Sequence, residues 1–253
     1  MRYIMIISYN GKNYFGFQKQ KNARTIQGEL EDKLKIIFKK DLAVVGSGRT
    51  DAKVSAYYQP VHFETDEKID KRKLLRSMNG LLEKDIRVLD IFETTLHARD
   101  SKKKKTYSYK MYLSEIDLPL ESDRLQLNPN INIKEMKKFA TLLKGTHDFI
   151  GFRSSGSATD TTVRTIYSTK LIKKDNHLDF YITGNGFLYR MVRNIVGTMI
   201  KIGEGKLNLT TIKPTLFTTF KSVHTAPADH LFMYDVKYLE KLNNGEINGK
   251  YSK

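Results

Sequence analysis

The segment best suited to chemistry reads Gly46-Ser47-Gly48-Arg49-Thr50-Asp51-Ala52 and follows the apolar run 42–45. Glycine accepts backbone conformations closed to other residues, so the chain can leave a strand sharply here and approach a ligand closely. If residues 49–51 are extended, Arg49 and Asp51 share one face, and a fixed cation then points the same way as the acid. Such a turn can present one carboxylate to a substrate. In isolation, the same pattern is typical of a surface loop with an ion pair.

Seven further short blocks are spread along the chain. They read Tyr9-Asn10-Gly11, Gly16-Phe17-Gln18, His97-Ala98-Arg99, Tyr107-Ser108-Tyr109, Thr162-Val163-Arg164-Thr165-Ile166, Met191-Val192-Arg193-Asn194-Ile195-Val196-Gly197 and Thr225-Ala226-Pro227-Ala228. Together with Gly48-Arg49-Thr50-Asp51-Ala52, they resemble the TruA family of tRNA pseudouridine synthases in order and spacing. The resemblance covers nearly the whole chain.

The resemblance implies catalytic roles for Asp51, Tyr107 and Arg193. Pseudouridine formation breaks the bond between ribose C1′ and uracil N1, rotates the base and joins C1′ to uracil C5. Asp51 would act covalently on uracil C6 or ribose C1′, or would promote glycal formation, and these routes stay open. Burial against a base favours the neutral carboxyl, so the family's partner, Arg193, would keep Asp51 ionised. Tyr107 would offer a ring for stacking and a hydroxyl for proton transfer at C5, although such a tyrosine is by itself more often a core residue.

Several cations are candidates for RNA contacts. A uridine inside a stem-loop must be flipped out of its stack, and Arg49 could fill the vacated space or bind a neighbouring phosphate. Tyr107, Arg49, Lys53 and Arg164 are the predicted substrate-binding residues. Further basic residues could contact the RNA backbone in a salt-dependent way: residues 71–73, residues 102–105 and Arg153. The run 102–105 is equally consistent with a solvated loop.

Two departures from the family pattern lie beside Asp51. The family usually continues with Gly-Val-His, whereas this chain has Lys53-Val54-Ser55. If position 53 needs a left-handed backbone, lysine costs about 1 to 2 kcal/mol there, which would favour a different loop path. Lys53 would also add a cation near Asp51. We therefore expect a divergent member of the family whose RNA target could have shifted.

Composition narrows the classes of partner and chemistry. The 253 residues include 44 basic and 28 acidic ones, a net charge of +16 that suits a polyanion such as RNA, although many lysines would simply coat the surface. The chain has no cysteine, which excludes disulfides, thiolate catalysis and cysteine-ligated zinc. Its six histidines are scattered singly, so we predict no metal. The family's reaction requires no cofactor.

Membrane and secretion signals are absent from the sequence pattern. No apolar stretch approaches the roughly 18 to 20 residues that a membrane span needs, and residues 1–9 lack the layout of a signal peptide. We therefore predict a cytoplasmic protein without a membrane partner.

Periodicity predicts alternating strands and helices. Strands are expected at residues 1–9, 58–65, 86–92, 106–113, 163–173, 178–183 and 231–238. Helices are expected at residues 26–38 after the cap Thr25, at 70–79 before Gly80, after the capping residue Asn132, at 187–202, and at 209–217, where Pro214 starts or interrupts the helix. Pro60 favours an edge position or a bulge for its strand.

This order favours an α+β fold built on split β-α-β units. The resemblance implies two ferredoxin-like halves that form a continuous antiparallel sheet with flanking helices and a central cleft, the pseudouridine synthase fold, in a homodimer. We expect an N-terminal half at residues 1–100 with the nucleophile loop. The C-terminal half, residues 101–253, would carry the active-site tyrosine and arginine.

Three functions remain open from the sequence. The first is an RNA pseudouridine synthase, an isomerase that acts at positions 38–40 of the tRNA anticodon stem-loop, as the resemblance implies. The second is the same reaction on another structured RNA such as ribosomal RNA, which Lys53 and Ser55 favour. The third is an RNA-binding protein that has lost catalysis, which the joint presence of Asp51, Tyr107 and Arg193 disfavours.

Overall fold

The computed structural model describes residues 1–156, 159–212, 217–222 and 224–238. The chain divides into two compact units. Unit 1 combines Met1–Lys105 with Phe232–Lys253, and unit 2 is Thr106–Leu231. The division expected from the sequence, between residues 100 and 101, placed the C-terminal strand with the second half, whereas nearly all of that strand belongs to unit 1.

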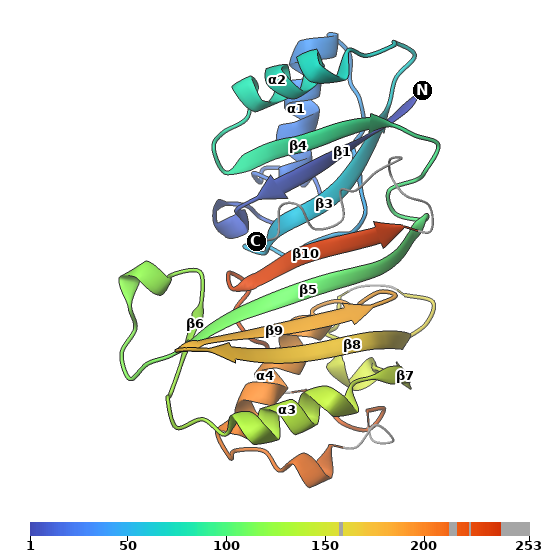
Figure 1. The fold of residues 1–253 in the computed structure, drawn as a ribbon. Helices are drawn as coiled ribbons and strands as arrows, with labels where there is room; N and C mark the ends of the chain where they lie inside the picture. The colour runs from blue at the N-terminus through green and yellow to red at the C-terminus, as the bar shows by residue number, and fades with distance from the viewer. Residues whose placement is uncertain (157–158, 213–216, 223, 239–253) are drawn as a thin grey trace. The chain divides into compact units, whose positions relative to one another are not determined.

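Unit 1 contains a sheet with the strand order β4-β1-β3-β10 (Figure 1). The strands are β1 (Arg2–Tyr9), β2 (Val45–Gly46), β3 (Ser55–Glu64), β4 (Ile86–Glu93) and β10 (Leu231–Tyr238). β1 pairs antiparallel with both β3 and β4, and β2 pairs antiparallel with β3. β10 instead runs parallel to β3, with Phe232 opposite Ser55.

Two helices complete unit 1: α1 (Ile26–Phe38) and α2 (Lys71–Leu81), with α2 against β4. The predicted cap of α1 is confirmed, because the Thr25 side chain accepts a hydrogen bond from Gly28 N. The stripe of Ile26, Leu30 and Leu34 is fully buried. The four-residue period of the sequence thus identifies the face of α1 that meets the core.

The predicted end of α2 is wrong. The helix begins at Lys71, one residue later than predicted, with Asp70 as its N-cap, and it continues through Gly80 to Leu81. Leu82 follows as an extended C-cap and is buried. One glycine costs a helix about 1 kcal/mol, too little to end a helix whose last turn leads to a buried leucine.

Of the two predictions for the strand with Pro60, the edge position is wrong, because β3 lies between β1 and β10. The bulge is present beside Pro60, because the register of β1 and β3 shifts between the pairs Ile7–Gln59 and Tyr9–Ala56. Pro60 is accommodated between Ala56, which pairs with β10, and Val61, which pairs with β2. Its carbonyl accepts a hydrogen bond from Ser47 N at 2.9 Å. The position of Pro60, which has no N–H to donate, therefore lies between the short pairing of β3 with β10 and its short pairing with β2, so no hydrogen bond of either pairing is lost.

Unit 2 has the strand order β5-β9-β8-β7 (Figure 1). Its elements are β5 (Lys102–Leu113), β6 (Leu125–Leu127), α3 (Ile133–Leu142), β7 (Gly145–Asp148), β8 (Val163–Lys174), β9 (His177–Gly184) and α4 (Met191–Gly203). β8 pairs antiparallel with β7 and β9, and β6 pairs parallel with β5. Asn132 caps α3 by accepting from Glu135 N, as predicted. The short 3-10 turns are η1 (Gly11–Asn13), η2 (Pro119–Glu121), η3 (Ile150–Phe152) and η4 (Leu209–Thr211).

Two further element boundaries differ from the prediction. α4 begins at Met191 rather than at residue 187, because Arg190 adopts a left-handed backbone with φ 56°. At the start of the helix predicted for 209–217, the structure has the 3-10 turn η4; residues 213–216, Pro214 among them, lie outside the described residues.

β5 begins four residues earlier than predicted, so the lysine run 102–105 lies in a strand and not in a solvated loop. Among the residues that the structure describes, no helix has the length and apolar character needed to cross a bilayer. The α+β class and the mostly antiparallel pairing agree with the prediction.

Candidate active site

The segment between β2 and β3, here called the Asp51 loop (residues 46–54), is tightly packed in unit 1. A Cβ atom on Gly46 would lie 2.5 Å from Cζ of Phe17, and one on Gly48 would lie 2.0 Å from Nζ of Lys105. Neither glycine has a positive φ. Close approach of the Phe17 ring, and not an unusual backbone, therefore favours glycine at position 46, whereas the close neighbour of Gly48 is the flexible end of the Lys105 side chain.

A buried hydrogen-bond chain holds the loop just before Asp51. The Thr50 and Tyr9 hydroxyls lie 2.8 Å apart, and Tyr9 donates to Gln59 Oε1 at 2.6 Å. Gln59 Nε2 in turn donates to the Gly48 carbonyl at 2.8 Å. Since Tyr9 gives its single proton to Gln59, Thr50 is the donor in the first pair. Buried polar groups that are all bonded in this way fix one arrangement of the backbone.

Burial alternates along residues 49–51, as expected of an extended chain. Thr50 is buried, whereas Arg49 is exposed and Asp51 is half-buried. Gly16, with φ 93°, passes so close to the loop that its Cβ would lie 2.8 Å from the Thr50 carbonyl. Phe17 N donates to that same carbonyl at 3.1 Å. The block Gly16-Phe17-Gln18 thus supports the backbone that carries Asp51.

The turn after Asp51 has the left-handed residue that the family pattern suggests. Lys53 has φ 68°. Val54 N donates to the Asp51 carbonyl at 3.2 Å and closes the turn, and Lys53 N donates to the Tyr14 carbonyl at 3.1 Å. The chain meets this geometry with an exposed lysine instead of glycine, at a cost of about 1 to 2 kcal/mol.

Ser55, the second departure from the family pattern, has a structural partner. It is 4% exposed, and its Oγ accepts a hydrogen bond from Gly11 N at 2.9 Å. A Cβ on Gly11 would lie 2.1 Å from the Val54 carbonyl. The block Tyr9-Asn10-Gly11 is therefore pressed against the end of the Asp51 loop, and the small serine fits this contact.

The block His97-Ala98-Arg99 is anchored through its buried alanine. Ala98 N donates to His62 Nδ1 at 3.1 Å, and the Ala98 carbonyl accepts from the Tyr238 hydroxyl at 2.7 Å. Burial, followed by the neighbouring His97, lowers the pKa of His62 to about 4. His62 is therefore neutral at pH 7, as an acceptor at Nδ1 requires.

In unit 2, Tyr107 lies on β5 and is 8% exposed. Its ring meets the Phe187 ring edge to face, with centroids 5.3 Å apart and an angle of 88° between the planes. This contact holds the ring in a defined orientation.

Arg193 lies in the first turn of α4, where the helix dipole disfavours a cation. Its Nε donates to the Ala226 carbonyl at 2.8 Å, and Ala226 N donates to the Arg193 carbonyl at 3.1 Å. Asn194 adds a contact with the same block, because its Oδ1 accepts from Thr225 Oγ1 at 2.7 Å. The blocks 191–197 and 225–228 are thus joined, and together they orient the guanidinium.

Arg164 folds back on its own loop. Its Nη1 donates to the carbonyls of Thr161 and Val163 at 2.8 and 2.6 Å. Burial lowers the pKa of the guanidinium. Of the predicted site residues, unit 1 carries Arg49, Asp51 and Lys53, and unit 2 carries Tyr107, Arg164 and Arg193.

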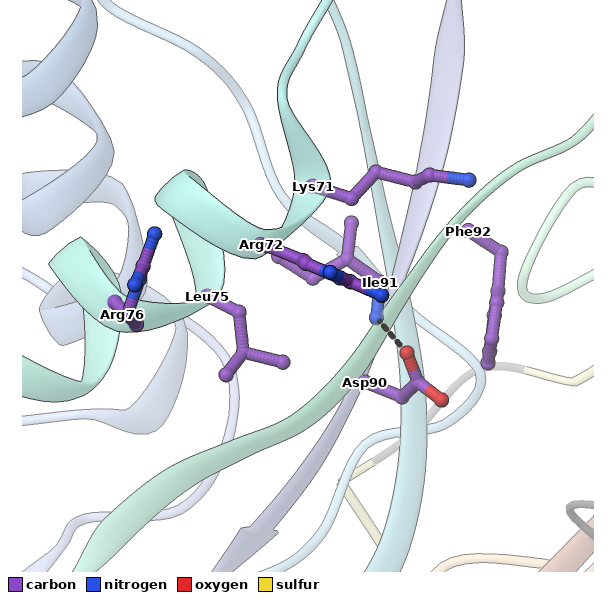
Figure 2. Close-up of a pocket in the computed structure, with 7 residues that line it drawn as sticks. All are labelled: Lys71, Arg72, Leu75, Arg76, Asp90, Ile91 and Phe92. Atoms are coloured by element: carbon purple, nitrogen blue, oxygen red, sulfur yellow. Dashed lines mark hydrogen bonds between the residues drawn. The ribbon is translucent and has the colours of Figure 1, made fainter.

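A basic groove of about 450 Å³ lies between α2 and β4 (Figure 2). It is lined by Lys71, Arg72, Leu75, Arg76, Asp90, Ile91 and Phe92. In Figure 2, the side chains of Lys71 and Arg72 extend from α2 toward β4, where Asp90 accepts a hydrogen bond from Ile91 N at 2.8 Å. The lining thus contains three cations and one carboxylate. The sequence prediction named the run 71–73 but missed Arg76, which lies one helical turn after Arg72.

Known proteins are similar to this chain over most of its length. A family model described as tRNA pseudouridine synthase matches residues 5–101 and 139–239. The tRNA pseudouridine synthase A of Ruminiclostridium cellulolyticum is 40% identical over 240 residues, which cover 92% of this chain and 98% of the relative. That of Anoxybacillus flavithermus is 39% identical over 237 residues, covering 92% and 96%. The chain belongs to the tRNA pseudouridine synthase family. The predicted resemblance is confirmed, and the protein is an isomerase that converts uridine to pseudouridine.

Three buried residues of this pseudouridine synthase were missed by sequence analysis as individual sites: Gln59 and Lys105, which meet the Asp51 loop, and His62, which anchors the block 97–99. All three are buried polar residues on strands. Gln59 and His62 stand in the otherwise apolar run 58–63. A polar residue inside such a run needs a buried partner, and this was the available signal.

Proposed function

We propose that this pseudouridine synthase modifies uridines of the tRNA anticodon stem-loop, at positions 38–40, with Asp51 as its nucleophile. The curated relatives are tRNA pseudouridine synthases, and a net charge of +16 suits an RNA substrate. The observation that carries the assignment of Asp51 is the convergence of separate segments on its loop. Gly16, Tyr9 and Gln59 all hold the backbone around a half-buried carboxylate.

The chemistry requires one covalent partner and one proton acceptor. Asp51 adds to uracil C6 or to ribose C1′, or promotes glycal formation; the C1′–N1 bond breaks, and C1′ joins C5 of the rotated base. Any bond that Asp51 has formed to C6 or C1′ then breaks and returns the free carboxylate. The proton on C5 must then leave, and the hydroxyl of Tyr107 is the proposed group for its transfer. Its ring is the proposed stacking surface for the uracil.

Arg193 is the proposed charge partner of Asp51. Its bond to the Ala226 carbonyl uses Nε, so the orientation of the guanidinium is set by the backbone of the block 225–228. A cation near the carboxylate stabilises the ionised form that attack requires.

RNA contacts are proposed for the predicted cations and for the groove of Figure 2. Arg49 is exposed beside Asp51 and suits the space left by a flipped base, and exposed Lys53 suits a neighbouring phosphate. Arg164 is the corresponding proposal in unit 2. The groove cations Lys71, Arg72 and Arg76 suit the backbone of a more distant part of the RNA.

We also propose a homodimer that works in the cytoplasm, where tRNA is modified. Light scattering of the purified protein tests the first point, with a mass near 59 kDa expected from two chains of 29.3 kDa. A mass of one chain would contradict it.

Asp51→Asn tests the catalytic assignment. We expect this variant to bind an anticodon stem-loop RNA with near wild-type affinity and to form no pseudouridine. Asp41→Asn, which changes an exposed acid in the same unit, should retain activity. Pseudouridine formation by Asp51→Asn would exclude Asp51 as the nucleophile.

Conservative substitutions test the proposed roles of Tyr107 and Arg193. Tyr107→Phe keeps the ring, so a loss of turnover with unchanged RNA affinity would assign the hydroxyl to proton transfer. Arg193→Lys keeps the charge but not the forked geometry, and we expect lower turnover from it. Full activity of both variants would remove these residues from the mechanism.

Lys53 favours a second candidate, the same reaction on another structured RNA, because a left-handed lysine beside Asp51 changes the surface that meets the substrate. Mapping pseudouridine across total RNA with and without the gene separates the two. Loss confined to ribosomal RNA would overturn the tRNA assignment and leave the reaction intact.

A further inference from the structure

Lys105 is a buried lysine whose amine meets the Asp51 loop. Its side chain lies at the point where β5 leaves the lysine run, and the residue is 8% exposed. A Cβ on Gly48 would lie 2.0 Å from its Nζ and 3.2 Å from its Cε. Within the described part of the chain, its amine makes neither a hydrogen bond nor an ion pair.

The charges around this amine are all positive. Burial, followed by the nearby Lys102 and Arg99, lowers the pKa of Lys105 to about 7. Burial also lowers the pKa of Lys102. Asp100 acts on Lys102 in the opposite direction, but no carboxylate acts on Lys105.

The elements packed around Lys105 carry other titratable groups, but none of these is a partner of its amine. The Asp51 loop carries Arg49 and Asp51, and β10, whose Met233 approaches the same glycine, carries Asp235 and Tyr238. None of these groups contributes to the pKa shift of Lys105.

Such an arrangement is unfavourable in the protein alone. A buried ammonium without a partner loses its hydration, and two further cations repel it. An apolar side chain of the same length would avoid both costs. An arriving anion would remove both, because it would supply a hydrogen-bond acceptor and a compensating charge.

We propose that Lys105, together with Arg99 and Lys102, binds a phosphodiester group of the RNA beside the Asp51 loop. This inference rests on the proposed function. The amine touches Gly48, three residues before Asp51, so the bound phosphate belongs to the nucleotides close to the target uridine. The site adds a charge contact from beneath the loop, whereas Arg49 acts from its exposed side.

A structural role of Lys105 and a role in anion binding predict opposite effects of its removal on the stability of the protein. If Lys105 served the fold, its removal would destabilise the protein. If it is kept for an anion, Lys105→Met should raise the melting temperature of the RNA-free protein at pH 7, because the variant buries no amine. Lys103→Met removes an exposed charge from the same strand and should leave the melting temperature nearly unchanged.

RNA binding gives the decisive measurement. Affinity for an anticodon stem-loop RNA is measured over a salt series in the inactive Asp51→Asn background, with and without Lys105→Met. We expect Lys105→Met to weaken binding and to reduce the slope of log affinity against log salt by about one, the value for one lost phosphate contact. Above pH 7, the affinity of the parent protein should fall as pH rises, whereas Lys105→Arg should bind with little pH dependence.

An unchanged salt slope and affinity in Lys105→Met would overturn the inference, and so would a lower melting temperature of that variant. Lys105→Gln provides a second, polar but uncharged replacement, for which the same loss of affinity and of salt slope is expected. Failure of the proposed function is distinguishable, because wild-type protein would then form no pseudouridine on any RNA. A changed salt slope would still establish the anion site in that case.

Discussion

Around Asp51, one residue has an unfavourable backbone conformation, and the polar groups of several neighbours are held in hydrogen bonds. Lys53 holds a left-handed conformation that glycine would adopt without steric cost. The preceding residues are secured by Tyr9 and Gln59, so the loop keeps its shape despite this cost. Strain of this kind persists where surrounding contacts over-determine the backbone.

Lys53→Gly should therefore stabilise the protein. We expect a gain of about 1 kcal/mol in the free energy of unfolding, from relief of the left-handed penalty after the extra entropy of glycine is subtracted. Chemical denaturation measures it. Ala52→Gly, in the same turn without a positive φ, should instead lose about 0.5 to 1 kcal/mol. A loss in both variants would show that Lys53 makes contacts worth more than its strain.

His62 should make stability fall in mild acid. Its pKa is about 4 in the folded protein against 6.5 for the ordinary group, so between these values the unfolded chain binds more protons. Stability from the neutral imidazole is complete above pH 6.5 and is lost as pH falls toward 4, by up to about 3 kcal/mol. Denaturation midpoints across this range should show the decline, and His62→Gln should flatten it.

An exposed histidine provides the control for that measurement. His224→Gln should leave the pH dependence as it is in the wild type. If the curve of His62→Gln matches that of the wild type, the acid sensitivity has another source.

Helices α4 and α2 each contain a glycine, and the two glycines have different surroundings. Gly197 in α4 lies where a Cβ would come 2.3 Å from the His224 carbonyl, so α4 can approach the chain before the block 225–228 only without a side chain there. Gly80 in α2 has nothing within 4 Å of its Cβ position. Contact at Gly197 keeps Arg193 beside Ala226, whereas Gly80 only weakens its helix.

The same substitution should therefore have opposite effects in the two helices. Gly80→Ala should stabilise the protein by about 1 kcal/mol through helix propensity. Gly197→Ala should destabilise it by about 1 to 3 kcal/mol, because the backbone of residue 224 has to shift, and it should lower turnover through Arg193. Thermal unfolding of both variants tests this, and a stabilised Gly197→Ala would contradict the close packing.

For the whole molecule, charge dominates the expected behaviour toward RNA. An excess of 16 positive charges acts over a longer range than any single contact. The groove between α2 and β4 and the cations near the Asp51 loop are separate parts of this excess within unit 1. Binding through several phosphates at once releases counterions, which makes affinity depend steeply on salt.

Affinity for tRNA should fall about 10³-fold between 50 and 200 mM salt, if about six phosphates are contacted. Filter binding or fluorescence anisotropy measures the slope. Arg72→Ala with Arg76→Ala should reduce it by about two if both groove arginines bind phosphates. A shallow slope in the wild type would mean that few phosphates are engaged.

By itself, the sequence determined the family, the α+β class and most strands, because ordered motif blocks and the periods of two and four residues are local patterns. It also located the Asp51 loop, whereas the left-handed backbone at Lys53, which the sequence raised only as a condition, is shown by the structure. The helix boundaries at Gly80 and before Met191 and the interior position of the strand with Pro60 were missed, because neighbouring segments outweigh a local propensity of about 1 kcal/mol.

Tertiary structure alone decided what holds the loop and what lies beneath it. Gln59 and His62 form hydrogen bonds with residues of other segments of the chain. Gly48 and Lys105 come into contact although they are 57 residues apart in sequence, and β10 returns to pair with β3. A lysine run has the same pattern in the sequence whether it is solvated or buried. Only the folded chain shows that the last lysine of the run is buried without a partner, because burial depends on segments that are distant in sequence.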